Sequence, residues 1–100
     1  MLYSVYCEDA VNTHDLREKH LVAHRAYLDE WRDKIFFSGP LQSDDAKTAH
    51  GSLFVLNVAD RAEAEAYIYN EVFYKVGIFA KVTIYRIRKG RYNPALIEGL

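Results

Sequence analysis

Apolar residues recur every second position in some segments of the chain, as in strands, and every three to four positions in others, as in helices. Leu2–Cys7, Ser52–Val58 and Ile78–Arg88 are rich in β-branched and aromatic residues, and the last of them alternates strictly between two faces. These three segments predict strands. A shorter apolar run over Ile35–Ser38 predicts a fourth, which Gly39-Pro40 ends.

A long amphipathic segment predicts the first helix, from a cap at Asn12 or Thr13 to about Asp33. Two polar side chains, Arg17 and His24, interrupt its apolar stripe about two turns apart. An imidazole on an apolar surface loses hydration, so it needs a partner or a cavity. His24 is therefore either a candidate for proton transfer or a core histidine bonded to a backbone carbonyl. The predicted stripe contains, in order around the helix, Leu16, Ala23, Tyr27, His20, Trp31, His24, Arg17, Leu28 and Leu21.

The second helix is predicted to begin after Asp60, which together with Glu63 forms an acidic variant of the capping box, and to run to about Asn70. Glu71–Val76 then forms a short connection or helical turn. The polar segment Gln42–His50 has no period and predicts a loop.

The elements follow the order β-α-β-β-α-β. This order predicts an α+β, ferredoxin-like fold with a four-stranded antiparallel sheet and two helices on one face. We expect residues 1–100 to form a single domain, in which residues 89–100 are a C-terminal tail.

Both faces of the predicted strands carry large apolar side chains, although two helices can cover only one face. In the strand after the polar loop, Leu53 and Val55 alternate with Phe54 and Leu56. An apolar face without a cover marks an interface, so we expect a homodimer with sheet packed on sheet. The apolar residues of the tail are expected to dock on the partner.

Composition narrows the possible partners and location. Thirteen basic and fourteen acidic residues give a net charge of −1, which provides no cationic field for nucleic acid. Cys7 is the only cysteine, so no intrachain disulfide is expected. Because the sequence shows no signal peptide and no long apolar run, we expect a cytoplasmic protein that is not held in a membrane.

Five features of the sequence occur together in an order that resembles the YCII-related (YciI-like) family of small bacterial proteins. They are Leu2–Tyr6 followed by Glu8-Asp9, Arg17 seven residues before His24, Gly39-Pro40, Gly51 after the polar loop, and Glu71-Val72-Phe73 with Gly77. The resemblance implies a fold related to the dimeric α+β barrels. The sequence departs from the family pattern at two places. Glu71-Val72 stands where the family usually has Asp-Pro, and Leu21 stands where some members have a second arginine.

The resemblance implies a small enzyme that needs no cofactor, with His24 as general acid and base and Glu71 as its orienting carboxylate. A carboxylate that binds one imidazole nitrogen fixes the tautomer and leaves the other nitrogen free to accept a proton. Arg17 is expected to bind an anionic group of the substrate, and Ser38 and Tyr6 are expected to line the same pocket. Such a set suits isomerisation or elimination on a small organic acid.

Other functions remain open at this point. His20 and His24 stand one turn apart, as in some metal sites, but no third ligand is evident, so we expect no metal. The chain could also be a non-catalytic ligand-binding or accessory domain, or a purely structural dimerisation module. An enzyme should hold His24 in a cavity and beside a carboxylate, a binding domain should keep only the cavity, and a structural module should have neither.

Overall fold

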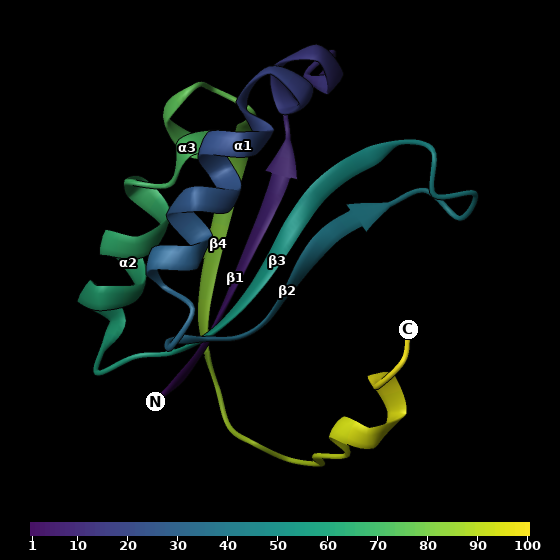
Figure 1. Ribbon diagram of the computed structural model, residues 1–100. Helices are drawn as coiled ribbons and strands as arrows, with labels where there is room; N and C mark the ends of the chain where they lie inside the picture. The colour runs from purple at the N-terminus through teal and green to yellow at the C-terminus, as the bar shows by residue number, and fades with distance from the viewer.

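Four strands form one antiparallel sheet in the order β2-β3-β1-β4, and the helices lie on one of its faces (Figure 1). The computed structural model describes residues 1–100. The strands are β1 (Leu2–Asp9), β2 (Ile35–Gln42), β3 (Ala49–Asn57) and β4 (Phe79–Ile87). The helices are α1 (His14–Glu30), α2 (Arg61–Tyr69), the single turn α3 (Val72–Lys75) and the 3-10 turn η1 (Pro94–Ile97). The predicted ferredoxin-like β-α-β-β-α-β order is confirmed.

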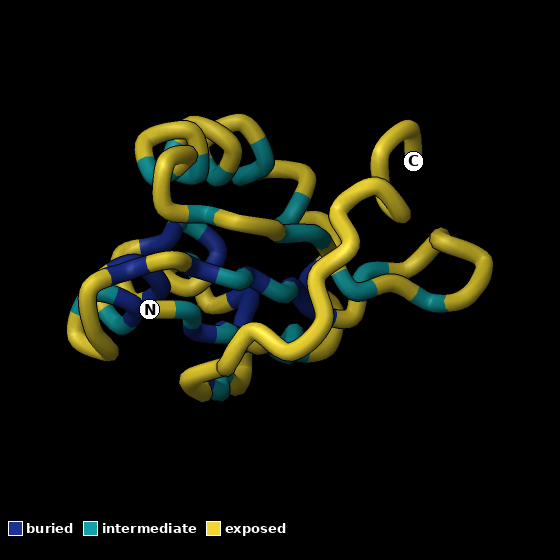
Figure 2. The backbone as a smooth tube through the Cα atoms, turned by 90° about the horizontal axis from the view of Figure 1, so that it is seen from below, coloured by how far each residue is buried: buried dark blue, intermediate teal, exposed yellow.

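The register of the sheet decides which residues enter the core. Val5 of β1 lies opposite Phe54 of β3 and Ile84 of β4, so these three side chains share the face that the helices cover. Figure 2 shows the buried backbone concentrated between the two layers. The core consists of Tyr3, Val5, Cys7, Phe54, Leu56, Val58, Ala64, Tyr67, Ile68, Phe73, Ile78, Phe79 and Ile84.

Helix α1 presents the predicted stripe to the core, but no residue of the helix is fully buried. Leu21, Tyr27 and Leu28 pack against the core while remaining partly accessible, and Ala23 at the edge of the stripe is exposed. The helix also begins without the predicted side-chain cap, because the Thr13 hydroxyl donates to the carbonyl oxygen of Ala10 at 3.0 Å. A cavity under α1, described below, explains why its inner face keeps contact with solvent.

The predicted capping box of α2 is present in modified form. The Asp60 Oδ1 atom accepts from the Glu63 backbone N–H at 2.9 Å, as expected. The Glu63 Oε1 atom reaches back to the N–H of Ala59, at 3.0 Å, instead of that of Asp60. The box therefore closes one residue earlier than in the standard motif.

The predicted end of the second strand at Ser38 is wrong. Strand β2 continues through Gly39-Pro40 to Gln42, and β3 begins at Ala49, so the predicted loop shortens to residues 43–48. Strand β2 lies at the edge of the sheet, where a proline does not interrupt the pairing if its nitrogen points away from the neighbouring strand. The extension brings Ser38–Pro40 alongside the residues of β3 that face α1.

The second face of the sheet has no helix over it. Tyr6, Phe37, Tyr85 and Ile87 expose between 42% and 69% of their surface there or at its edge. The tail leaves β4 as an extended segment that curls away from the sheet, and every residue from position 89 onward is exposed (Figures 1 and 2). No helix combines the length and apolar character needed to cross a membrane.

Three acidic protons, two of them on buried residues and one on the partly buried Tyr27, make the fold sensitive to alkali. Burial raises the pKa of Cys7 far above its ordinary value of 9.0 and that of Tyr27 to about 12. Burial also raises the pKa of Tyr67, whose hydroxyl is buried without a hydrogen-bond partner. Above pH 9 the unfolded chain releases protons that the folded chain retains, so stability is full below that pH and falls as the pH rises.

We expect the free energy of unfolding to fall by about 2 kcal/mol between about pH 8 and pH 10.5 from Cys7 alone. Urea unfolding at several pH values measures this slope. In Cys7→Ala the slope should become shallower, because only the tyrosines remain. An equal slope in both proteins would show that the thiol does not contribute.

Candidate active site

His24 and Glu71 meet between α1 and α3, although they lie far apart in the sequence. The imidazole Nδ1 is hydrogen-bonded to the Glu71 Oε1 atom. The His24 side chain is 12% exposed and that of Glu71 is fully buried. The structure thus brings together the two residues that the sequence analysis assigned to catalysis.

The local fold around α3 explains how a glutamate fills this position. Glu71 is the N-cap of α3, and its Oε2 atom accepts from the backbone N–H of Phe73 at 2.8 Å and of Tyr74 at 3.3 Å. One carboxylate oxygen therefore holds α3 while the other holds the imidazole. Three amide and imidazole partners compensate for burying the carboxylate.

The ring of Phe73 fixes the plane of the imidazole. It stacks on His24 with the ring centroids 3.8 Å apart and the planes 4° from parallel. The second imidazole nitrogen, Nε2, has no hydrogen-bond partner within the chain. His24 is consequently held by one nitrogen and one face, and its other nitrogen remains available for a proton.

A cavity of about 240 Å³ lies beside His24, between α1 and strands β2 and β3. Leu21, Leu28 and Phe54 provide apolar walls, and Ser38 and Ser52 provide hydroxyls. Arg17 and Arg25 also reach it. The space is large enough for one substituted six-membered ring, and its mixed lining is typical of a site for a small polar molecule.

Most hydrogen-bond donors of Arg17 are committed within the chain. Its Nε and Nη2 atoms donate to the two carboxylate oxygens of Asp9 at 2.7 and 2.9 Å. The Nη2 atom also contacts the Gly51 carbonyl oxygen at 3.0 Å and the Ser52 hydroxyl at 3.3 Å. The Arg17 and Asp9 side chains are 13% and 5% exposed. These contacts use the Nε and Nη2 donors of Arg17, and its Nη1 atom has no hydrogen-bond partner within the chain.

Gly51 is required for that arrangement. It lies opposite Glu8 in β1, and a side chain at this position would place its Cβ 2.0 Å from the carbonyl oxygen of Cys7. No side chain fits so close to a backbone atom. The close approach of β1 and β3 also puts the Gly51 carbonyl within reach of Arg17.

The other predicted site residues divide between the two faces of the sheet. Ser38 lines the cavity with His24, as expected. The structure does not bring Tyr6 to this pocket, because its neighbours Val5 and Cys7 point to the helices and Tyr6 therefore points to the open face. Cys7 is fully buried in the core, where burial raises its pKa and keeps the thiol protonated.

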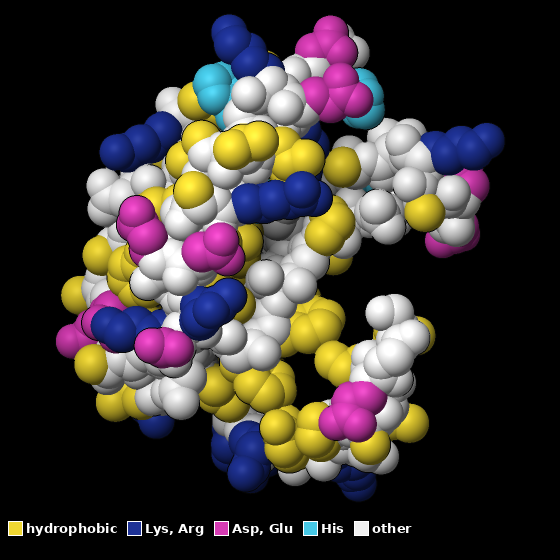
Figure 3. All heavy atoms as spheres, viewed as in Figure 1, with side chains coloured by type: hydrophobic (Ala, Val, Ile, Leu, Met, Phe, Trp, Pro, Cys, Tyr) yellow, Lys and Arg dark blue, Asp and Glu magenta, His cyan; other side chains and the backbone are white.

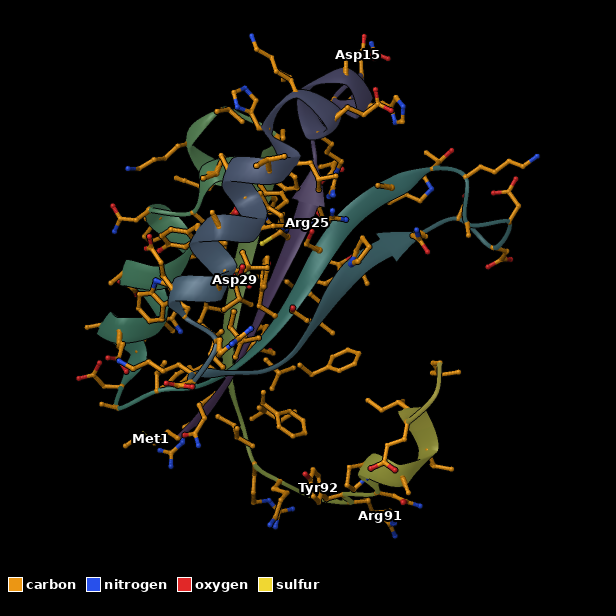
Figure 4. All side chains as sticks on the ribbon, viewed as in Figure 1. Met1, Asp15, Arg25, Asp29, Arg91 and Tyr92 are labelled. Atoms are coloured by element: carbon orange, nitrogen blue, oxygen red, sulfur yellow. The ribbon has the colours of Figure 1, made fainter.

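The sequence analysis missed three residues of the site. Asp9 appeared only as part of an acidic pair, Phe73 appeared only as an aromatic position of the family pattern, and Arg25 lies outside the predicted apolar stripe. Arg25 follows His24 directly, and its long side chain reaches back over the stripe to the cavity. In Figure 4 Arg25 is labelled beside α1, in front of the strands.

A wider cleft of about 540 Å³ lies next to this cavity, between the start of α1 and the loop joining β2 and β3. Arg17 lines both spaces and separates them. The one cluster with metal-ligand spacing, His14, Asp15 and Glu18, is fully exposed at the start of α1, near the labelled Asp15 in Figure 4. It does not include His24.

The geometry can be compared with known proteins. A protein-family model for the YCII-related domain matches residues 1–88. The chain belongs to the YCII-related family. No curated protein sequence matches it.

The chain is also similar to a solved structure over most of its length. That structure is of the 5-chloro-2-hydroxyhydroquinone dehydrochlorinase TftG from Burkholderia phenoliruptrix AC1100, in complex with 2,5-dihydroxybenzoquinone. The two chains are 29% identical, with a TM-score of 0.83, and the match covers 90% of this chain and 96% of that one. A structure of At3g17210 from Arabidopsis thaliana has 10% identity and a TM-score of 0.47, covering 92% and 97% of the two chains.

Proposed function

We propose that this YCII-related protein is an enzyme without a cofactor that eliminates a halide from a small hydroxylated ring. The observation that carries the proposal is the buried His24–Glu71 pair, whose free imidazole nitrogen belongs to a residue lining a cavity of about 240 Å³. A binding domain would need the cavity but not the pair, and a structural module would need neither. The likeness to TftG supports elimination over isomerisation.

One side chain both accepts and returns a proton in the first step of the proposed reaction. His24 Nε2 accepts the proton of a ring hydroxyl, and the resulting imidazolium is stabilised by Glu71. The imidazolium then returns this proton to the neighbouring ring carbon that carries the halogen, which becomes tetrahedral beside a new carbonyl. Acid and base are therefore the same residue at successive steps.

Elimination completes the reaction. The hydroxyl para to the first loses its proton to solvent water while the carbon–halogen bond breaks, and the halide leaves with the bonding electrons. A hydroquinone has then become a quinone, and HX has been released. The ring is oxidised at its hydroxyls and reduced at the carbon that held the halogen, so no external oxidant is consumed.

The test is halide release by the purified wild-type protein from chlorohydroquinone and from 5-chloro-2-hydroxyhydroquinone, measured by ion chromatography with quinone formation followed by absorbance. We expect halide and quinone in equal amounts, above the rate without protein. Unsubstituted hydroquinone is the matched control and should yield no quinone under exclusion of oxygen. Binding of these rings without halide release would reject the enzyme and favour the ligand-binding alternative.

We further propose that two copies of the chain associate through the open face of the sheet. The exposed apolar residues of that face and the uncovered tail support this arrangement. Figure 3 shows hydrophobic side chains on both sides of the hollow between the sheet and the tail. In this proposal residues 89–100 of each copy pack on the other copy.

Light scattering after size-exclusion chromatography tests the dimer. Val55 lies in a central strand on the open face, opposite Ser4 and Phe37. We expect Val55→Glu to produce monomers, because a charge in an interface core loses its hydration. Val22→Glu on the outer side of α1, where Val22 is 82% exposed, is the matched control and should remain dimeric. A monomeric wild-type protein would reject the interface.

A further inference from the structure

The charges around the His24 cavity cancel except for one. Arg17 is paired with Asp9 by two hydrogen bonds, and both side chains are almost fully withdrawn from solvent. The Glu71 carboxylate is committed to His24 and to two backbone amides of α3. No further acidic residue lines the cavity. The remaining charged group is the guanidinium of Arg25.

Arg25 has no partner within the chain. It is exposed, and no ion pair or side-chain hydrogen bond involves it, not even with Asp29 one turn further along α1. Its side chain lines the cavity together with Ser38, Gly39 and Pro40 of β2 on the opposite side. All of its donors are therefore available to a molecule in the cavity.

We propose that Arg25 selects the substrate by binding an ionised oxygen of the ring, either a carboxylate or an acidic enol. The proposal rests on the assignment of the His24 cavity as the active site, and it further specifies that the substrate carries a negative charge. A guanidinium recognises two oxygens in one plane, so it also orients a flat ring. Arg17, which was expected from the sequence to bind the anionic group, has its Nε and Nη2 donors committed to Asp9, Gly51 and Ser52.

The position of Arg25 next to His24 supports this division of tasks. The free nitrogen of the imidazole belongs to one residue of α1 and the free guanidinium to the next, and both line one cavity. A ring held by Arg25 through one substituent can thus present another substituent to His24. The apolar walls formed by Leu21, Leu28 and Phe54 exclude water from the rest of the ring.

The experiment compares two isosteric probes that differ in charge, 4-hydroxybenzoate and 4-hydroxybenzamide. Their dissociation constants are measured by NMR from the shifts of the His24 and Phe73 ring signals, which report binding in this cavity. We expect the wild-type protein to bind the anion about tenfold more tightly than the amide, given the partial exposure of Arg25. In Arg25→Gln the two constants should become nearly equal, and Arg25→Lys should retain part of the preference.

Arg32→Gln is the matched control, because it removes the same charge from an exposed arginine just beyond α1 that does not line the cavity. It should leave the preference for the anion unchanged. Equal binding of the two probes by the wild-type protein, absence of binding included, would overturn the proposal, as would an unchanged preference in Arg25→Gln. Because no turnover is measured, these outcomes are independent of whether the protein releases halide.

Discussion

Replacing His24 by asparagine is expected to lower kcat for halide release by about 10²- to 10⁴-fold while the protein stays folded. Asparagine can still form a hydrogen bond to the Glu71 carboxylate, so the buried charge keeps a partner, but it cannot accept a proton at the position of Nε2. KM should change little, since the walls of the cavity and Arg25 are retained. Steady-state kinetics together with circular dichroism measures both effects.

Glu71→Gln tests whether the carboxylate sets the protonation of the His24 ring. The amide oxygen of glutamine can still cap α3, but its NH₂ group donates to His24 Nδ1 and forces the ring proton onto Nε2. The imidazole then cannot accept a proton from substrate, so we expect a loss of kcat comparable to that of His24→Asn. His20→Asn, one turn earlier and outside the cavity, is the control. Retention of more than a tenth of the activity in His24→Asn would rule out this residue as the base.

Most of the fold could be predicted from the sequence, because the apolar pattern of each element has the period of a helix or of a strand. The stripe on α1 and the strict alternation in β4 predict both the type and the inward face of these elements. The second strand was predicted too short, because Gly39-Pro40 normally signals a turn and only the position of β2 at the edge of the sheet permits it to continue. Edge position is a property of the whole sheet and is not visible locally.

The site was predictable only in part. His24 stands out because it interrupts an apolar stripe, and its partner Glu71 was found through the family pattern. The partner of Arg17 could not be found in this way, because Asp9 reaches it only after the register of β1 against β3 is set. Arg25 was not among the predicted site residues, because helical angle alone leaves it outside the apolar stripe and ignores the length of an arginine side chain.

The Asp9–Arg17 pair is expected to contribute mainly to stability. The Asp9 side chain is only 5% exposed in the pair, so in Arg17→Met its carboxylate loses the guanidinium partner at a buried position. Breaking a buried pair from one side costs about 3–5 kcal/mol, so we expect a loss of this size in the free energy of unfolding. Urea denaturation measures it.

The double variant Asp9→Leu/Arg17→Met distinguishes the loss of the ion-pair attraction from the cost of leaving the Asp9 carboxylate buried without a partner. It should be more stable than Arg17→Met alone, because no unpaired carboxylate remains in the interior. A single-variant loss below about 1 kcal/mol would place the pair among ordinary surface ion pairs. If Arg17 also bound the substrate anion directly, Asp9→Asn would free its guanidinium and lower KM for anionic rings. We expect no such gain, because Arg25 already provides the free cation at the site.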